Sequence, residues 1–235
     1  MYDPASSTDT APRDGSGSTA HYSTRDFWSK ENLKFTKSHF RMEKAARLIN
    51  TTARGKDYNL LDVGCGPATL MHLLDDNIHY HGIDIAIHVP APNLIEVDFL
   101  KAPIKFGDTL FDIVLAQGVF EYVGTLQSQK LAEISKLLAD NAKFILSYWN
   151  LGHRDKQVNP AFSNIQSYNQ LRKGLARYFT IDHSFPVGYN WHQREPGRKL
   201  MKAAQMRANI NVPFISPVLA VEYFFICSPR RSKRA

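Results

Sequence analysis

The chain has 235 residues, 43% hydrophobic and 22% charged, which suits one globular domain with a sizeable core. The net charge of +7 lies in residues 191–235, while residues 1–190 are neutral, so a uniformly basic nucleic-acid-binding protein is disfavoured. Two cysteines are too few for a disulfide scaffold. The longest apolar stretch, residues 217–227, contains Glu222 and is too short to cross a bilayer. Without an apolar N-terminal signal, these features predict a cytoplasmic protein.

The first segments of the chain differ sharply in composition. Residues 1–21 are rich in Ser, Thr, Gly and Pro and predict a disordered tail. Residues 22–54 carry apolar side chains such as Phe40, Met42 and Ile49 at mixed helical spacings. This pattern predicts one or two amphipathic helices that form an N-terminal helical lid.

After residue 55, short apolar runs alternate with helical stretches. We expect strands at residues 58–63, 79–85, 94–99, 110–116, 142–148, 179–185 and 219–227, and helices at residues 67–75, 125–140 and 167–178. Continuously apolar strands separated by helices indicate a parallel sheet covered on both faces, which is an α/β doubly wound fold. The pattern predicts one domain over residues 55–229, with residues 191–218 as a lid insertion and residues 230–235 as a basic tail.

A glycine turn follows the first predicted strand, in the order Asp62-Val63-Gly64-Cys65-Gly66-Pro67. Glycines let the backbone approach a ligand closely, and a following helix offers free N–H groups. A dinucleotide GxGxxG motif is absent because position 69 is Thr, and no GK[ST] sequence of a phosphate-binding loop follows. We expect Cys65 to pack within the turn rather than to act as a nucleophile.

Acidic or polar residues also end the next three predicted strands. Asp84 lies twenty residues beyond Gly64 and can accept hydrogen bonds from a ribose diol. Asp98 and Phe99 end the third strand, and Gln117 ends the fourth. Because the carboxyl ends of parallel strands share one edge of the sheet, these residues predict a single nucleotide-type site.

With these motifs the chain resembles the class I S-adenosylmethionine-dependent methyltransferases, and within them the small-molecule branch that includes ubiquinone- and methionine-biosynthesis enzymes. The resemblance implies a Rossmann-like sheet of seven strands, with the last strand antiparallel between the fifth and sixth. It implies S-adenosylmethionine as cofactor and no metal. It also implies roles for the matching residues. The methionine moiety would be held by Asp62, Gly64, Cys65 and Gly66, and the ribose by Asp84. The adenine would contact Ile85, Asp98 and Phe99, and Gln117 would line the sulfonium side.

A hydroxyl acceptor needs a general base near the transferred methyl group. The predicted catalytic residues are His153, Tyr122 and Glu121, and further candidates are Tyr148 and His192. Related enzymes often have His at the position of Tyr122, so a histidine-dependent role is not transferred to it. His79 and His81 share a strand face, but without a third ligand nearby they do not predict a metal site.

The sequence favours methylation of a small molecule, most simply at oxygen, with a secondary-metabolite or lipid-like acceptor. A predicted cationic lid helix with Arg198, Lys199 and Lys202 would admit an anionic acceptor, rest on a lipid surface, or simply form a solvated helix face. The alternative is an RNA or other nucleic-acid methylase that uses the basic C-terminal region, although no nucleic-acid partner is expected. A third possibility is an inactive homologue that binds the cofactor as a partner subunit. We expect a monomer or a homodimer.

Overall fold

One mixed sheet of seven strands organises the molecule in the computed structural model. The structure describes residues 24–150, 162, 164–189, 204, 209, 216 and 220–230. The strands are β1 (Tyr58–Val63), β2 (Ile78–Asp84), β3 (Leu94–Glu96), β4 (Phe111–Gln117), β5 (Leu138–Trp149), β6 (Phe179–Tyr189) and β7 (Ala220–Pro229). Their order is β3-β2-β1-β4-β5-β7-β6. Pairs among β1 to β5 are parallel, and β7 is antiparallel to both β5 and β6. The predicted fold and strand insertion are therefore confirmed.

Successive side chains of the central strands enter two different cores, one on each face of the sheet. In β1, Leu61 and Val63 join one buried cluster, whereas Leu60 joins the other. This follows from the two-residue period of a strand, and it explains why these strands are apolar at nearly every position.

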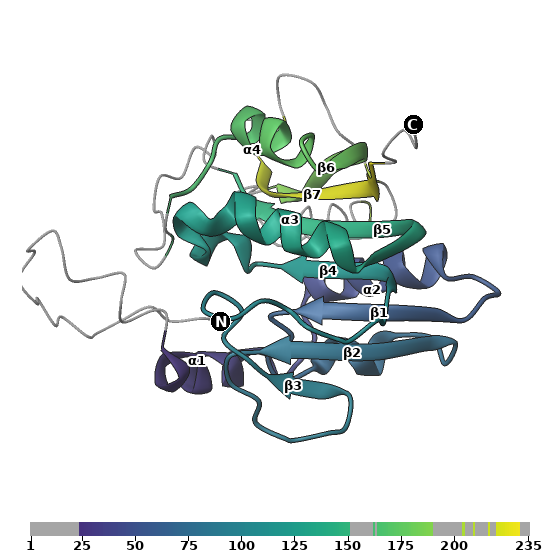
Figure 1. Cartoon of the computed structure of the whole chain (residues 1–235), viewed down its shortest axis with the longest axis vertical. Helices are drawn as coiled ribbons and strands as arrows, with labels where there is room; N and C mark the ends of the chain where they lie inside the picture. The colour runs from purple at the N-terminus through teal and green to yellow at the C-terminus, as the bar shows by residue number, and fades with distance from the viewer. Residues whose placement is uncertain are drawn as a thin grey trace, which may run out of the picture.

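Helices cover both faces. The helices are α1 (Arg25–Glu31), α2 (Phe40–Thr52), α3 (Gln127–Leu137) and α4 (Tyr168–Leu175). Figure 1 shows α3 on the near face of the sheet and α2 behind it, and buried residues of the two helices belong to opposite cores. The short helix α1 lies beside the carboxyl ends of β1 to β3 (Figure 1).

Local signals explain where several helices begin. Ser167 starts α4 with a reciprocal capping box to Gln170. The Nδ1 atom of His39 accepts from the backbone N–H of Met42 at the start of α2. The helices α1 and α2, joined by a 3₁₀ turn at Asn32–Phe35, occupy the predicted N-terminal helical segment.

The helix predicted over residues 67–75 is wrong. That segment forms only a five-residue 3₁₀ helix, Thr69–Leu73. The reason is that Gly66 and Ala68 both have left-handed backbone conformations, with φ of 54° and 55°, and a regular α-helix cannot pass through them.

Strand β3 is also shorter than predicted, so Asp98 and Phe99 lie in the loop after it. The predicted tail at residues 1–21, most of the lid insertion and most of the basic tail lie outside the described residues. Within the described part of the chain, no helix is long and apolar enough to cross a membrane.

Candidate active site

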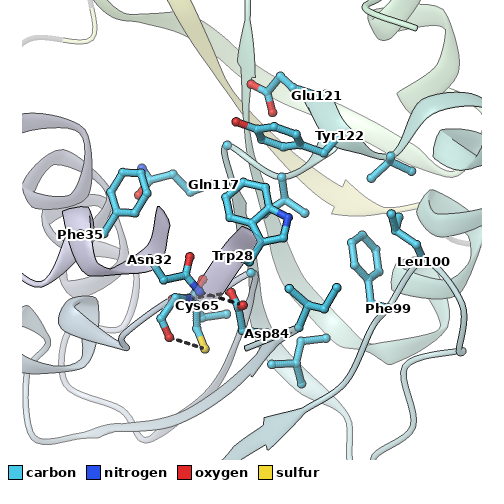
Figure 2. A pocket seen from close by; sticks show the side chains of 18 of the residues that line it. Trp28, Asn32, Phe35, Cys65, Asp84, Phe99, Leu100, Gln117, Glu121 and Tyr122 are labelled. Atoms are coloured by element: carbon cyan, nitrogen blue, oxygen red, sulfur yellow. Dashed lines mark hydrogen bonds between the residues drawn. The ribbon is translucent and has the colours of Figure 1, made fainter. Parts of the chain in front are cut away.

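A cavity of about 430 Å³ lies at the carboxyl edge of the parallel strands. Strand order reverses between β1 and β4, and a ligand of an open α/β sheet binds in the crevice at such a switch point. Residues from the first helices, Trp28, Asn32 and Arg41 among them, line the opposite wall. In Figure 2, Asn32 and Asp84 lie at one end, Glu121 and Tyr122 at the other, and Trp28 between them.

The structure brings together all predicted site residues that it describes. These residues line the cavity: Asp62, Gly64, Cys65, Gly66, Asp84, Ile85, Asp98, Phe99, Gln117, Glu121 and Tyr122. Predicted His153 and the candidate His192 lie outside the described residues. Tyr148 does not line the cavity; it is buried in the core, where its hydroxyl accepts from Gln127 Nε2 and from the backbone N–H of Gln166.

The turn after β1 requires glycine for two separate reasons. Gly64 has φ of +74°, and a Cβ there would lie 2.3 Å from Cγ2 of Val119. Gly66 also has a positive φ, and a Cβ there would face the Asn32 side chain. The backbone at Gly64 therefore lies close to Val119 in the loop after β4, and a side chain at position 64 would clash with that loop.

Asp84 is the acid that ends β2, and its carboxylate is 8% exposed. Oδ1 accepts from Asn32 Nδ2 and from the backbone N–H of Ala86, both at 3.0 Å. Oδ2 accepts from the backbone N–H of Gly66 at 2.8 Å. Burial raises the pKa of Asp84, while these three donors oppose the rise.

Asp62 and Asp98 have different surroundings. Asp62 is buried, and its Oδ2 accepts from the Tyr80 hydroxyl at 2.8 Å. Burial is the main reason that the pKa of Asp62 rises to about 7. Asp98 accepts from the backbone N–H of Leu100 and lies 2.9 Å from Lys101 Nζ.

Glu121 lines the polar end of the cavity, next to an ion pair formed by two residues from distant elements. Its side chain is 2% exposed, and Oε1 accepts from the backbone N–H of Trp149 at 2.8 Å. Among the described residues, buried Oε2 has no hydrogen-bond partner. Arg41 Nη1 lies 3.3 Å from both carboxylate oxygens of Glu222. Burial, and then the charge of Glu222, raise the pKa of Glu121 to about 7.

Aromatic rings surround this polar end. The rings of Trp28 and Tyr122 meet edge to face, with centroids 4.8 Å apart, and Phe162 meets Tyr122 at 5.3 Å. All three line the cavity. Burial raises the pKa of Tyr122 to about 12, so its hydroxyl stays protonated near neutral pH and acts as a hydrogen-bonding group.

Sequence reasoning missed Asn32 and Arg41. Each lies in a polar helical stretch, and nothing local indicates that either faces the strand edge.

His81 packs its ring against Phe106 and Phe111. In the described part of the chain, no three His, Cys, Asp or Glu side chains are grouped to hold a metal ion.

The geometry supports the predicted cofactor. Asp84 and the glycine turn both line the cavity at the carboxyl edge of the sheet, and the turn leaves no room for a Cβ at Gly64. A seven-stranded sheet of this order with such a site defines the class I S-adenosylmethionine-dependent methyltransferases.

Comparison with known proteins agrees. A family model described as "Methyltransferase domain" matches residues 38–205, and the chain belongs to this family. No curated protein matches it in sequence.

Solved structures share the fold at low sequence identity. The CcbJ methyltransferase from Streptomyces caelestis is 11% identical with a TM-score of 0.62, covering 89% of this chain and 99% of that one. The 1,6-didemethyltoxoflavin-N1-methyltransferase from Burkholderia thailandensis, solved with S-adenosylhomocysteine, is 16% identical with a TM-score of 0.57, covering 95% and 93%. The N-methyltransferase NodS from Bradyrhizobium japonicum, also solved with S-adenosylhomocysteine, is 11% identical with a TM-score of 0.52, covering 87% and 99%.

Proposed function

We propose that this methyltransferase acts on a small-molecule acceptor and that Glu121 accepts the acceptor's proton. The observation that carries the proposal is the buried carboxylate of Glu121, which lines the cavity with Oε2 without a hydrogen-bond partner among the described residues. A buried acceptor atom of this kind is costly unless a ligand supplies the missing donor.

The residues at the other end of the cavity are proposed to hold the cofactor. Asp84 would accept from the ribose hydroxyls, and the Gly64–Gly66 turn with Asp62 would hold the methionine moiety. Asp98 and Phe99, with Ile85, would contact the adenine, and Gln117 would line the sulfonium side. When bound, S-adenosylmethionine supplies an electrophilic methyl group on a positively charged sulfur.

The chain's own contribution is alignment, exclusion of water and proton transfer. Burial and the negative charge of Glu222 raise the pKa of Glu121 to about 7, which matches a base that works near neutral pH. The predicted hydroxyl acceptor and an amine acceptor would each donate a proton to Oε2.

The cofactor proposal is tested by calorimetry with S-adenosylhomocysteine. Wild-type protein should bind it, and Asp84→Ala should weaken binding at least tenfold, because the buried ribose partner is lost. The matched control is Asp76→Ala, since Asp76 is an exposed acid outside the cavity. No binding by wild-type protein, or equal binding by Asp84→Ala, would contradict the proposal.

The nucleic-acid alternative depends on the basic residues of the C-terminal region. Most of them lie outside the described residues, and the described cavity lining contains a single Arg or Lys, Arg41. No specific observation therefore favours this alternative.

A further inference from the structure

The polar end of the cavity carries an excess of negative charge. Glu121 comes from the loop after β4, Glu222 from β7 and Arg41 from α2. Because β7 runs antiparallel, its first residues lie at the edge where the parallel strands end, and Glu222 pairs in register with Trp149 at the end of β5. Two carboxylates thus share one guanidinium. Burial and Arg41 both lower the pKa of His39, so this nearby side chain adds no positive charge near neutral pH.

The guanidinium of Arg41 contacts Glu222 and not Glu121, so one positive charge serves two carboxylates. Arg41 lies 3.3 Å from both oxygens of Glu222, and it attracts Glu121 only through its charge. The hydrogen bond given to Glu121 comes from the neutral backbone N–H of Trp149. A buried carboxylate without a direct ionic contact is expensive, and a cation brought by a ligand would offset that cost.

The aromatic side chains next to Glu121 also suit a cation. Trp28 and Tyr122 both line this part of the cavity, and their rings meet at 4.8 Å. Aromatic rings attract cations through their quadrupoles, most strongly where water is excluded. Beyond them, Val123, Leu126 and Phe162 provide apolar lining for the rest of an acceptor.

A hydroxyl acceptor fits this electrostatic setting less well. A hydroxyl is neutral when it enters, so it brings no positive charge to offset the ionised carboxylate of Glu121. The predicted anionic acceptor would add a further negative charge beside that carboxylate. An ammonium group that gives up its proton becomes neutral instead.

We propose that the acceptor is an amine that enters as its ammonium ion and is held between the Glu121 carboxylate and the rings of Trp28 and Tyr122. This inference rests on the proposed function and specifies its substrate class. The N–H bond breaks and the proton passes to Oε2 of Glu121. The nitrogen lone pair then forms the new N–C bond as the S–C bond breaks, and that bond's electrons return to sulfur. The methylated amine leaves with a positive charge on nitrogen, and Glu121 returns its proton to water.

The test compares benzylamine with benzyl alcohol, which share a ring and a methylene group but differ in charge. Binding of each probe is measured by calorimetry on the protein loaded with S-adenosylhomocysteine, at pH 7.5. The variant is Glu121→Gln, which keeps the shape of the side chain and removes its charge. The matched control is Glu43→Gln, because Glu43 is an exposed glutamate on α2 outside the cavity.

Wild-type protein and Glu43→Gln should bind benzylamine at least tenfold more tightly than benzyl alcohol. Glu121→Gln should lose that preference while its affinity for S-adenosylhomocysteine and its circular dichroism spectrum stay near wild type. Three results would overturn the inference: benzyl alcohol binding as tightly as benzylamine, an amine preference that survives in Glu121→Gln, or no binding of either probe.

Two controls separate this inference from its premises. A loss of S-adenosylhomocysteine affinity in Glu121→Gln would assign the carboxylate to the methionine ammonium group, and would overturn the acceptor proposal alone. Failure of wild-type protein to bind S-adenosylhomocysteine would instead reject the proposed function.

Discussion

The buried carboxyl of Glu121 should make the stability of the protein depend on pH, and Glu121→Gln should remove that dependence. Folding raises the pKa of Glu121 from its usual 4.5 to about 7. The folded state therefore prefers the protonated carboxyl. Its contribution is fully present below pH 4.5 and is lost as the pH rises through 7.

The size of the effect follows from the two pKa values. Each pH unit between them lowers the unfolding free energy by about 1.4 kcal/mol, because the carboxyl ionises first in the unfolded chain. The loss is about 1 kcal/mol at pH 5 and about 3 kcal/mol at pH 8. Wild-type protein should thus lose about 2 kcal/mol of unfolding free energy between these pH values that Glu121→Gln retains. Other carboxyls, Asp62 included, titrate in both proteins and cancel in the comparison.

Urea denaturation at pH 5 and pH 8 measures this difference directly. The Gln side chain adds a buried amide that needs partners, but this penalty is the same at both pH values. Glu43→Gln should follow the wild-type pH dependence. If Glu121→Gln loses as much stability as wild type between pH 5 and pH 8, the carboxyl is not buried and charged as described.

Three further predictions concern the strand edge. Gly64→Ala should lower the unfolding free energy by about 2–4 kcal/mol, because the backbone is left-handed there and the new Cβ would lie 2.3 Å from Val119. Gly55 also has a positive φ but open space around it, so Gly55→Ala should cost about 1 kcal/mol in the same denaturation assay. Asn32→Ala removes a donor that lowers the pKa of Asp84. As the pH is lowered, the variant should therefore lose affinity for S-adenosylhomocysteine at a higher pH than wild-type protein does. Identical pH profiles of the two proteins in calorimetry would argue against this. Burial raises the pKa of the Cys65 thiol far above its usual range, so iodoacetamide should leave Cys65 unmodified at pH 7.5, as peptide mass spectrometry would show.

The strands could be predicted because their signal is local. A strand buried on both faces, such as β1 or β4, must be apolar at nearly every position, and this pattern is visible without a structure. The edge at which such strands end follows from their parallel order, so acids such as Asp84 and residues such as Gln117 could be assigned to one site.

What could not be predicted depends on contacts between distant segments. Asn32 and Arg41 reach the site because the first helices dock on the carboxyl edge of the sheet, where Asn32 is 3% exposed beside Asp84. The turn before Thr69 fails to become an α-helix because Ala68 adopts a left-handed conformation. Alanine rarely does so, and no neighbouring residue signals it.

The two acids with a pKa near 7 have different consequences for the site. Oδ2 of Asp62 accepts a hydrogen bond from the Tyr80 hydroxyl, and the charge of Asp84 adds to the effect of burial in raising the pKa of Asp62. Asp84 receives three N–H donors, which favour its charged form. Negative charge at one end of the strand edge is therefore favoured on Asp84 over Asp62. At the other end, burial and Glu222 raise the pKa of Glu121, whose Oε2 faces no donor in the described part of the chain. In the proposal above, the ammonium group of the acceptor offsets the charge on Oε2 of Glu121, and this is why the pH dependence of stability and the preference for an amine should disappear together in Glu121→Gln.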